Sequence, residues 1–138
     1  LIVADYAAGL AVVDLARRSV QAMPSDSLEM LDGIDGLISV EDHGRRYLIA
    51  IQNGTSPRRV IVLYPYPDGR RIGSVDVREQ NAPWGEATLL TPSAGLSFYY
   101  VADSQWERYG KGGVLIDGKP PRDTQIRELQ MADDILAI

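Results

Sequence analysis

The side chains best suited to chemistry in this sequence are carboxylates and amides at the ends of apolar runs. Three such runs end in Asp5, Asn53 and Asp103, which are 48 and then 50 residues apart. Because a similar residue recurs at the same place in each run, we expect the three side chains to face one common rim of a repeated structure. Two short loops, residues 31–35 and 84–86, precede the second and third runs and add further carboxylates.

These oxygen-bearing side chains predict a site for a divalent cation such as Ca²⁺. That ion takes about six to eight oxygen ligands in irregular geometry, so ligands contributed by several segments suit it. The predicted metal ligands are Asp32, Asn53, Glu86 and Asp103, with Asp5 and Asp35 as neighbouring acids. Trp106, in a long loop, is the candidate for lining a substrate pocket.

Each of these residues also has a purely structural interpretation. An Asp or Asn at a strand end commonly accepts hydrogen bonds from its own loop, which would account for Asp5 and Asp103 without a ligand. Asp32 precedes a glycine and could simply form a turn. Asn53 precedes Gly54, which leaves the backbone free to bend and present the amide.

The composition excludes several other kinds of reactive site. The chain has no cysteine, so disulfides, thiolate metal sites and cysteine nucleophiles are excluded, and the compartment stays open. The single histidine, His43, lies in a predicted turn at the end opposite the rim, so a multi-histidine site is also excluded. No serine lies in a Gly-x-Ser-x-Gly elbow, which argues against a nucleophilic-serine mechanism.

The charge of the chain argues against nucleic acid as a partner. The formal net charge is −5, and the arginines occur in scattered pairs at predicted turns, so no basic face is available to neutralise phosphates. No apolar run approaches the roughly 20 residues that a membrane-spanning helix needs, so we expect no membrane segment. The chain begins at Leu1 inside a strand-like run, which suggests a segment of a longer protein.

The elements that must position these residues are short β-strands separated by Gly, Pro and Asp turns. Four such strands per unit of about fifty residues are typical of an antiparallel β-propeller blade. A β-sandwich would also contain many short strands, but it does not predict similar strand ends at nearly constant spacing. The predicted strands span residues 1–5, 9–14, 19–23, 36–41, 47–53, 59–63, 72–77, 87–91, 98–103 and 125–131.

The repeat predicts an all-β fold, a single β-propeller segment of about two and a half four-stranded antiparallel blades. The blades are predicted over residues 1–27 (partial), 28–79 (complete) and 80–138, with a long insertion at about 104–124 in the last. The tail is predicted as a strand to about Met131, because a helix there would place Asp133 on its apolar stripe. Open blade faces expose apolar side chains, so we expect the rest of a propeller, or self-association, to cover them.

Six short segments carry a family resemblance through their order and spacing: residues 1–6, 31–34, 51–54, 59–63, 67–69 and 100–106. With these segments the chain resembles the senescence marker protein/gluconolactonase family and the related strictosidine synthase-like and NHL-type six-bladed propellers. The resemblance covers residues 1 to about 129, and it implies that the chain belongs to the C-terminal half of a six-bladed ring.

In lactonases of that family, Glu, Asn and Asp side chains hold a divalent cation at the pore. The resemblance implies that Asp32 is both a metal ligand and the catalytic proton acceptor, and that Asn53 is a ligand. The family's Glu ligand lies in a first blade outside this segment, and Leu31 stands where the family usually has proline. We therefore expect a hydrolase of small-molecule lactones or related esters that uses Ca²⁺ or another divalent cation. The alternative is a non-catalytic propeller that binds proteins or ligands.

Overall fold

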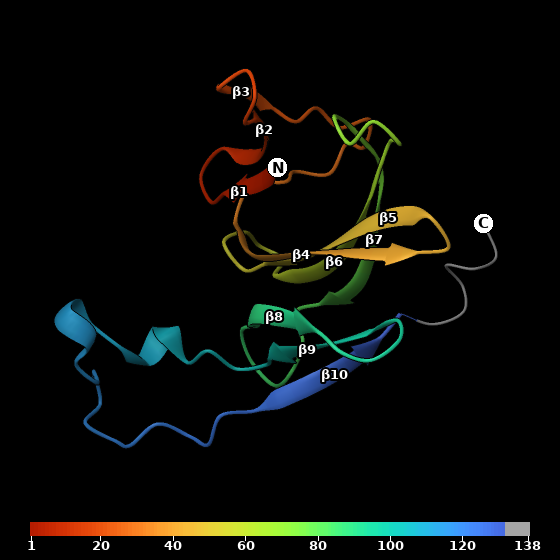
Figure 1. The fold of residues 1–138 in the computed structure, drawn as a ribbon. Helices are drawn as coiled ribbons and strands as arrows, with labels where there is room; N and C mark the ends of the chain where they lie inside the picture. Colours follow the sequence, from red (N-terminus) through yellow and green to blue (C-terminus); the bar gives the residue numbers. More distant parts are fainter. Residues whose placement is uncertain (132–138) are drawn as a thin grey trace.

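The computed structural model describes residues 1–131, about half of which lie in antiparallel β-sheets (Figure 1). The first sheet contains β1 (Ile2–Asp5), β2 (Gly9–Asp14) and β3 (Ser19–Ala22). The second contains β4 (Ile34–Asp42), β5 (Arg45–Gln52), β6 (Arg59–Pro65) and β7 (Ile72–Gln80). The third contains β8 (Thr88–Pro92), β9 (Ser97–Val101) and β10 (Ile126–Gln130). The predicted all-β class is confirmed, and over residues 1–131 the three sheets stay separate, as in part of a propeller, rather than closing into a barrel.

The hairpin turns form where residues tolerate a left-handed backbone. His43 and Gly44 join β4 to β5 with φ values of 47° and 74°, as a two-residue hairpin turn requires. The His43 side chain is 80% exposed and lies beside Asp42, which fits a role in the turn alone. Between β6 and β7, Gly69 has φ 67° and donates its backbone N–H to the Tyr66 carbonyl at 2.8 Å.

The second sheet is buried on both faces, which explains why β5 and β6 are apolar almost without interruption. Successive side chains of these strands enter two different apolar clusters. The cluster shared with the third sheet contains Tyr47, Ile49, Ile51, Val60, Val62, Phe98, Tyr100, Ala102 and Met131. The cluster on the side of the first sheet contains Leu10, Met23, Ile34, Leu48, Ala50, Ile61, Leu63 and Ile72. At about 1.5–3 kcal/mol for each large side chain buried, these clusters supply most of the energy that holds the sheets together.

The strands β4 and β8 lie side by side, and small features of both make this approach possible (Figure 1). A Cβ atom at Gly36 of β4 would lie 2.5 Å from the end of the Leu90 side chain of β8, so a larger residue there would force that side chain to move. Each strand also contains a β-bulge, with Asp35 as the extra residue in β4 and Leu89 in β8. Because a bulge redirects the side chain of its extra residue, Asp35 is aimed by the backbone irregularity rather than by regular alternation.

The predicted insertion is a long loop between β9 and β10 that contains two short 3-10 turns, η1 (Trp106–Arg108) and η2 (Lys111–Gly113). The Arg108 guanidinium lies inside this loop, donating to the Pro120 carbonyl at 2.9 Å and pairing with Asp117 at 3.1 Å. One partly buried arginine therefore holds together a loop that has almost no strand or helix structure of its own.

The tail pairs with β9 as β10, so the predicted strand is confirmed. Asp133, which weighed against a helix there, lies outside the described residues. Over residues 1–131, no helix is both long enough and apolar enough to cross a membrane.

The first and third sheets expose apolar side chains, among them Val3 and Val20 on the first and Tyr99 and Ile126 on the third. Exposed apolar side chains on a sheet are typical of surfaces that meet another element. The expectation that further blades or a second copy cover these sheets stays a prediction.

Candidate functional site

One end of the molecule gathers polar side chains from all three sheets, and Asn53 lies at their centre. Its Oδ1 accepts a hydrogen bond from the Tyr6 hydroxyl at 3.2 Å, and its Nδ2 donates to Asp35 Oδ2 at 2.9 Å and to the Ala87 carbonyl at 3.0 Å. Tyr6 follows β1, Asp35 lies in β4 and Ala87 precedes β8. One amide therefore links the three sheets at this end.

Asp35 is the second centre of this group, which we call the rim cluster and define as Tyr6, Asp35, Asn53 and Thr88. The Oδ2 of Asp35 also accepts a hydrogen bond from the Thr88 hydroxyl. Burial, and then the negative charges of Asp35 and Glu86, raise the pKa of Tyr6 above its ordinary value near 10. The phenol therefore stays protonated at neutral pH and keeps its hydrogen bond to Asn53.

Two glycines allow the loops that carry Asp32 and Asn53 to pack directly on each other. The Gly33 N–H donates to the Tyr6 carbonyl at 2.7 Å, and the Gly54 N–H donates to the Gly33 carbonyl at 3.0 Å. A Cβ at Gly54 would lie 2.5 Å from the Tyr6 ring, and a Cβ at Gly33 would lie 2.8 Å from the Gly54 backbone. Gly33 and Gly54 are therefore needed for the close contact between these two loops, and not only for the bending of each loop.

Gln52, which the sequence analysis missed, fixes the position of the loop that precedes β4. Its buried side-chain Nε2 donates to the carbonyls of Met30 and Asp32 at 2.8 and 2.7 Å. Its Oε1 accepts from Arg59 Nε at 2.9 Å, and Arg59 in turn pairs with Glu29. A signal was available, because Gln52 is a polar residue continuing a run that is otherwise apolar and fully buried.

Asp32 is held by its backbone and not by its carboxylate. Its Oδ1 is buried and has no hydrogen-bond partner within residues 1–131. Nearly all buried polar atoms in folded proteins have a partner, so an unpartnered carboxylate oxygen marks a place where a further group is expected.

Glu86 and Asp103 belong to a second polar group, which we call the outer cleft and define by Arg58, Trp84, Glu86, Asp103 and Arg122. These residues line a space of about 450 Å³ between the second and third sheets. The buried Asp103 Oδ2 accepts from Arg122 Nη2 at 2.7 Å and Nε at 3.1 Å, and Glu86 lies 3.4 Å from Arg58 Nη1. The hydrogen bond to Asp103, and then its charge, outweigh partial burial and raise the pKa of Arg122, which stays charged.

Asp5 and Trp106 lie apart from both groups. Asp5 Oδ1 accepts hydrogen bonds from the backbone N–H groups of Ala7 and Ala8 at 2.9 and 2.8 Å. This is the capping of its own loop that we considered as the structural alternative. The Trp106 side chain is exposed in η1, one residue before Glu107, which lines the outer cleft.

The four predicted metal ligands therefore occupy two neighbouring places and not a single one. Asn53 and the Asp32 loop lie at the rim cluster, whereas Glu86 and Asp103 lie in the outer cleft. Within the described part of the chain, no three His, Asp or Glu side chains converge in a way that could hold a metal ion.

Comparisons of this chain with protein-family models, with characterised proteins and with solved structures find no match.

Proposed function

We propose that this end of the sheets is the reaction site of a divalent-cation-dependent hydrolase of lactones or related esters, with Asp32 as its central carboxylate. The observation that carries the proposal is the buried Oδ1 of Asp32, which lacks a partner among residues 1–131. An unsatisfied buried acceptor costs about 1–3 kcal/mol, and more when it is charged. A bound cation or substrate group would recover that energy. The resemblance to gluconolactonase-like propellers supports the same assignment.

The residues at this end fit a divalent cation in the kind of ligand that they offer. The Asp32 carboxylate and the Asn53 amide oxygen are both hard oxygen donors, although the Asn53 oxygen already accepts the Tyr6 hydroxyl. Because no three acidic or histidine side chains of residues 1–131 converge, water and substrate oxygens must complete the six to eight that Ca²⁺ takes. A cation bound here would polarise an ester carbonyl and lower the pKa of a bound water.

The chain's own residues would divide the remaining tasks. Asp32 would accept a proton from the water that attacks the carbonyl carbon, and return it to the ring oxygen as the acyl C–O bond breaks, so that this oxygen leaves as a hydroxyl group. Gln52 holds the carbonyls of Met30 and Asp32, on either side of Leu31, and so restrains the backbone of the loop that carries the Asp32 carboxylate. The rim cluster keeps the neighbouring Asn53 loop in contact with the Asp32 loop.

The test combines titration calorimetry with Ca²⁺ and Mn²⁺ and a pH-indicator assay with δ-gluconolactone. Asp32→Asn is expected to weaken cation binding at least tenfold and to lower kcat/KM by about 10²-fold or more, the usual contribution of an acid–base group. Asp5→Asn is the matched control, because it removes the same charge at the same end and keeps an oxygen for the loop. Absence of cation binding to the wild-type chain, or equal binding by Asp32→Asn, would end the proposal.

A non-catalytic binding scaffold is the second candidate, and one observation favours it. Apart from Asp32, the acidic groups considered as ligands already have partners: Asp35 with Asn53, Glu86 with Arg58 and Asp103 with Arg122. A rim of mutually satisfied polar groups is rigid, as a binding surface requires. Lactones that bind without being hydrolysed, with or without Ca²⁺, would favour the scaffold.

A further inference from the structure

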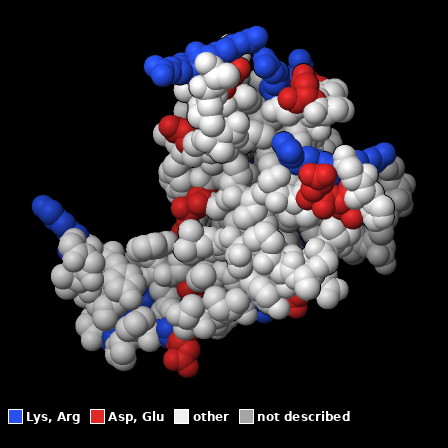
Figure 2. All heavy atoms as spheres, in the orientation of Figure 1, with Lys and Arg blue, Asp and Glu red and all other residues white. Residues whose placement is uncertain are grey.

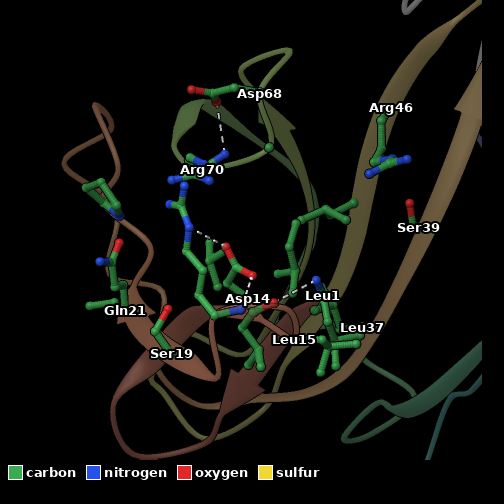
Figure 3. Close-up of a pocket in the computed structure, with 18 of the residues that line it drawn as sticks. Leu1, Asp14, Leu15, Ser19, Gln21, Leu37, Ser39, Arg46, Asp68 and Arg70 are labelled. Atoms are coloured by element: carbon green, nitrogen blue, oxygen red, sulfur yellow. Dashed lines mark hydrogen bonds and ion pairs between the residues drawn. The ribbon is translucent and has the colours of Figure 1, made fainter.

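A large cleft lies at the opposite end of the sheets, between the first sheet and the β4–β5 hairpin (Figure 3). Its volume is about 1000 Å³, at the upper end of the range for small-molecule sites. The turn after β2 and the turn between β6 and β7 border its mouth, whereas the rim cluster lies where β1 ends and β4 begins. The cleft is therefore separate from the site described above.

The floor of this cleft is apolar. Ile2 and Val12 of the first sheet and Leu37 and Leu48 of the second line it, and all four belong to or pack against the core on that side. Leu15 adds an exposed apolar side chain near the mouth. A floor of this kind favours the alkyl part of a ligand, since burial of apolar area is worth about 25 cal/mol per Å².

The upper part of the cleft is lined by arginines that have few ion-pair partners among the described residues. Within residues 1–131, the guanidinium groups of Arg46 and Arg70 have no hydrogen-bond or ion-pair partner, and Arg17 lies 3.9 Å from its nearest carboxylate, Asp14. Arg46 and Arg70 lie on opposite sides of the cleft in Figure 3, with Leu37 below Arg46. Figure 2 shows arginine side chains, with carboxylates among them, at the same upper end of the molecule, whereas both lysines lie in the insertion between β9 and β10.

The two carboxylates of the cleft are engaged by their own turns. Asp14 Oδ1 accepts the backbone N–H of Arg17 at 3.0 Å, and Asp68 Oδ1 accepts the backbone N–H of Arg70 at 3.0 Å. Three arginines against two aspartates leave this cleft positive in a chain whose net charge is −5. Guanidinium groups that face one cleft repel each other, and an anion between them relieves that repulsion through charge-assisted hydrogen bonds.

We propose that this cleft binds an amphiphilic carboxylate, a medium-chain fatty acid or a molecule of that shape, with its head on Arg46 and Arg70 and its alkyl chain on the apolar floor. The positive charge of the arginines favours a carboxylate head group, and the apolar floor favours an alkyl tail. A strand-forming peptide is the competing occupant, because β1 is an edge strand. Leu1 and Val13 exchange two backbone hydrogen bonds, N–H to C=O in each direction. The backbone N–H and C=O groups of Ile2 and Ala4 therefore point away from β2, toward the open edge of the sheet. A peptide on that edge gives the unpaired arginines no partner, which is why we favour the carboxylate.

The test is titration of the chain with sodium dodecanoate below its micellar concentration, with acetate and dodecanol as probes of the head alone and the tail alone. Dodecanoate is expected to bind, acetate not to bind measurably, and dodecanol to bind at least fivefold more weakly. Arg46→Gln and Arg70→Gln are each expected to raise the Kd for dodecanoate about fivefold, and the double variant to raise it more than tenfold. Arg18→Gln, which removes the same charge beside the cleft and not in it, is expected to change the Kd less than twofold.

Three results would overturn the proposal: no binding of dodecanoate, unchanged binding by the double variant, or dodecanol binding as tightly as dodecanoate. A short uncharged peptide such as acetyl-Thr-Val-Thr-Val-Thr-amide serves as the competing probe, and its binding where dodecanoate does not bind would assign the cleft to strand addition instead. Raising NaCl from 50 to 500 mM is a second measurement on the wild type, and it is expected to weaken dodecanoate binding while leaving dodecanol binding unchanged. Because Asp32 is at the other end, its variants should not affect any of these results.

Discussion

The link that Asn53 makes between the three sheets gives the most demanding prediction. Asn53→Ala removes one hydrogen bond to a charged acceptor, Asp35, and two to neutral groups, Ala87 and Tyr6. A bond to a charged group is worth about 1.5–3 kcal/mol and a neutral one about 0.5–1.5 kcal/mol. Since Asn53 is only half-buried, water replaces part of what is lost, and we expect unfolding free energy to fall by about 2–3 kcal/mol.

Asn53→Asp should be worse at neutral pH, although it is nearly the same size. It replaces the Nδ2 donor by a carboxylate oxygen that faces Asp35 Oδ2, at a position where the present N–O distance is 2.9 Å. Two negative charges about 3 Å apart repel by about 1–5 kcal/mol for effective dielectric constants between 80 and 20, and the exposure of Asp35 places the pair near the lower value. At low pH one of the two carboxylates takes up a proton, so the extra cost should disappear as the pH falls toward 4.

The assay is urea unfolding of the wild type and both variants at pH 7.5 and pH 4. Asn53→Asp should be less stable than Asn53→Ala by about 1 kcal/mol or more at pH 7.5, and the two should converge at pH 4. Asn81→Asp is the matched control, because among residues 1–131 the Asn81 side chain bonds through its Oδ1 alone, as acceptor from the Arg58 N–H, and an aspartate keeps that oxygen. The reasoning fails if Asn53→Asp equals the wild type at pH 7.5, or if its deficit does not depend on pH.

Three further predictions follow from single contacts. Gly54→Ala should destabilise the chain by about 1–3 kcal/mol in urea unfolding, because the new Cβ would lie 2.5 Å from the Tyr6 ring, whereas Gly73→Ala, with ordinary contacts, should change little. Burial, and then a hydrogen-bonded glutamate, raise the pKa of Tyr100 to about 12. The stability that the protonated phenol contributes below pH 10 should therefore be lost as the pH rises from 10 to 12. Over that interval the unfolding temperature of Tyr100→Phe should fall less steeply than that of the wild type. Asp32→Asn should leave the metal-free chain as stable as the wild type, or more stable by about 1 kcal/mol in thermal unfolding, because it removes the negative charge from a half-buried carboxylate whose buried Oδ1 has no partner among residues 1–131. A loss of more than about 1 kcal/mol would contradict this explanation.

The features of the fold that could be predicted from the sequence are those that neighbouring residues determine. The unbroken apolar run of β5 must lie in a strand buried on both faces, and the Asp68-Gly69 pair permits the tight turn that follows β6. Both features depend on side-chain periodicity and backbone freedom over a few residues, so they are visible before any tertiary contact is known. The antiparallel sheets, one per repeat, follow from them.

The sequence could not determine which groups pair at the candidate site. Asn53 meets Tyr6, Asp35 and Ala87 from 47, 18 and 34 residues away, and these encounters depend on how the sheets pack. The bulge that orients the Asp35 side chain lies where the pairing of β4 with β5 shifts register. The residue types near position 35 did not predict this shift.

Thus the sequence alone determined the strands, their turns and the set of oxygen-bearing side chains near one end, because these depend on short-range alternation and residue type. Only the tertiary structure decided that Asn53 links the sheets, that Asp103 pairs with Arg122 and that a buried Asp32 oxygen has no partner within residues 1–131. Charge pairing and burial are properties of distances between segments far apart in the chain, and those distances exist only after the sheets have packed.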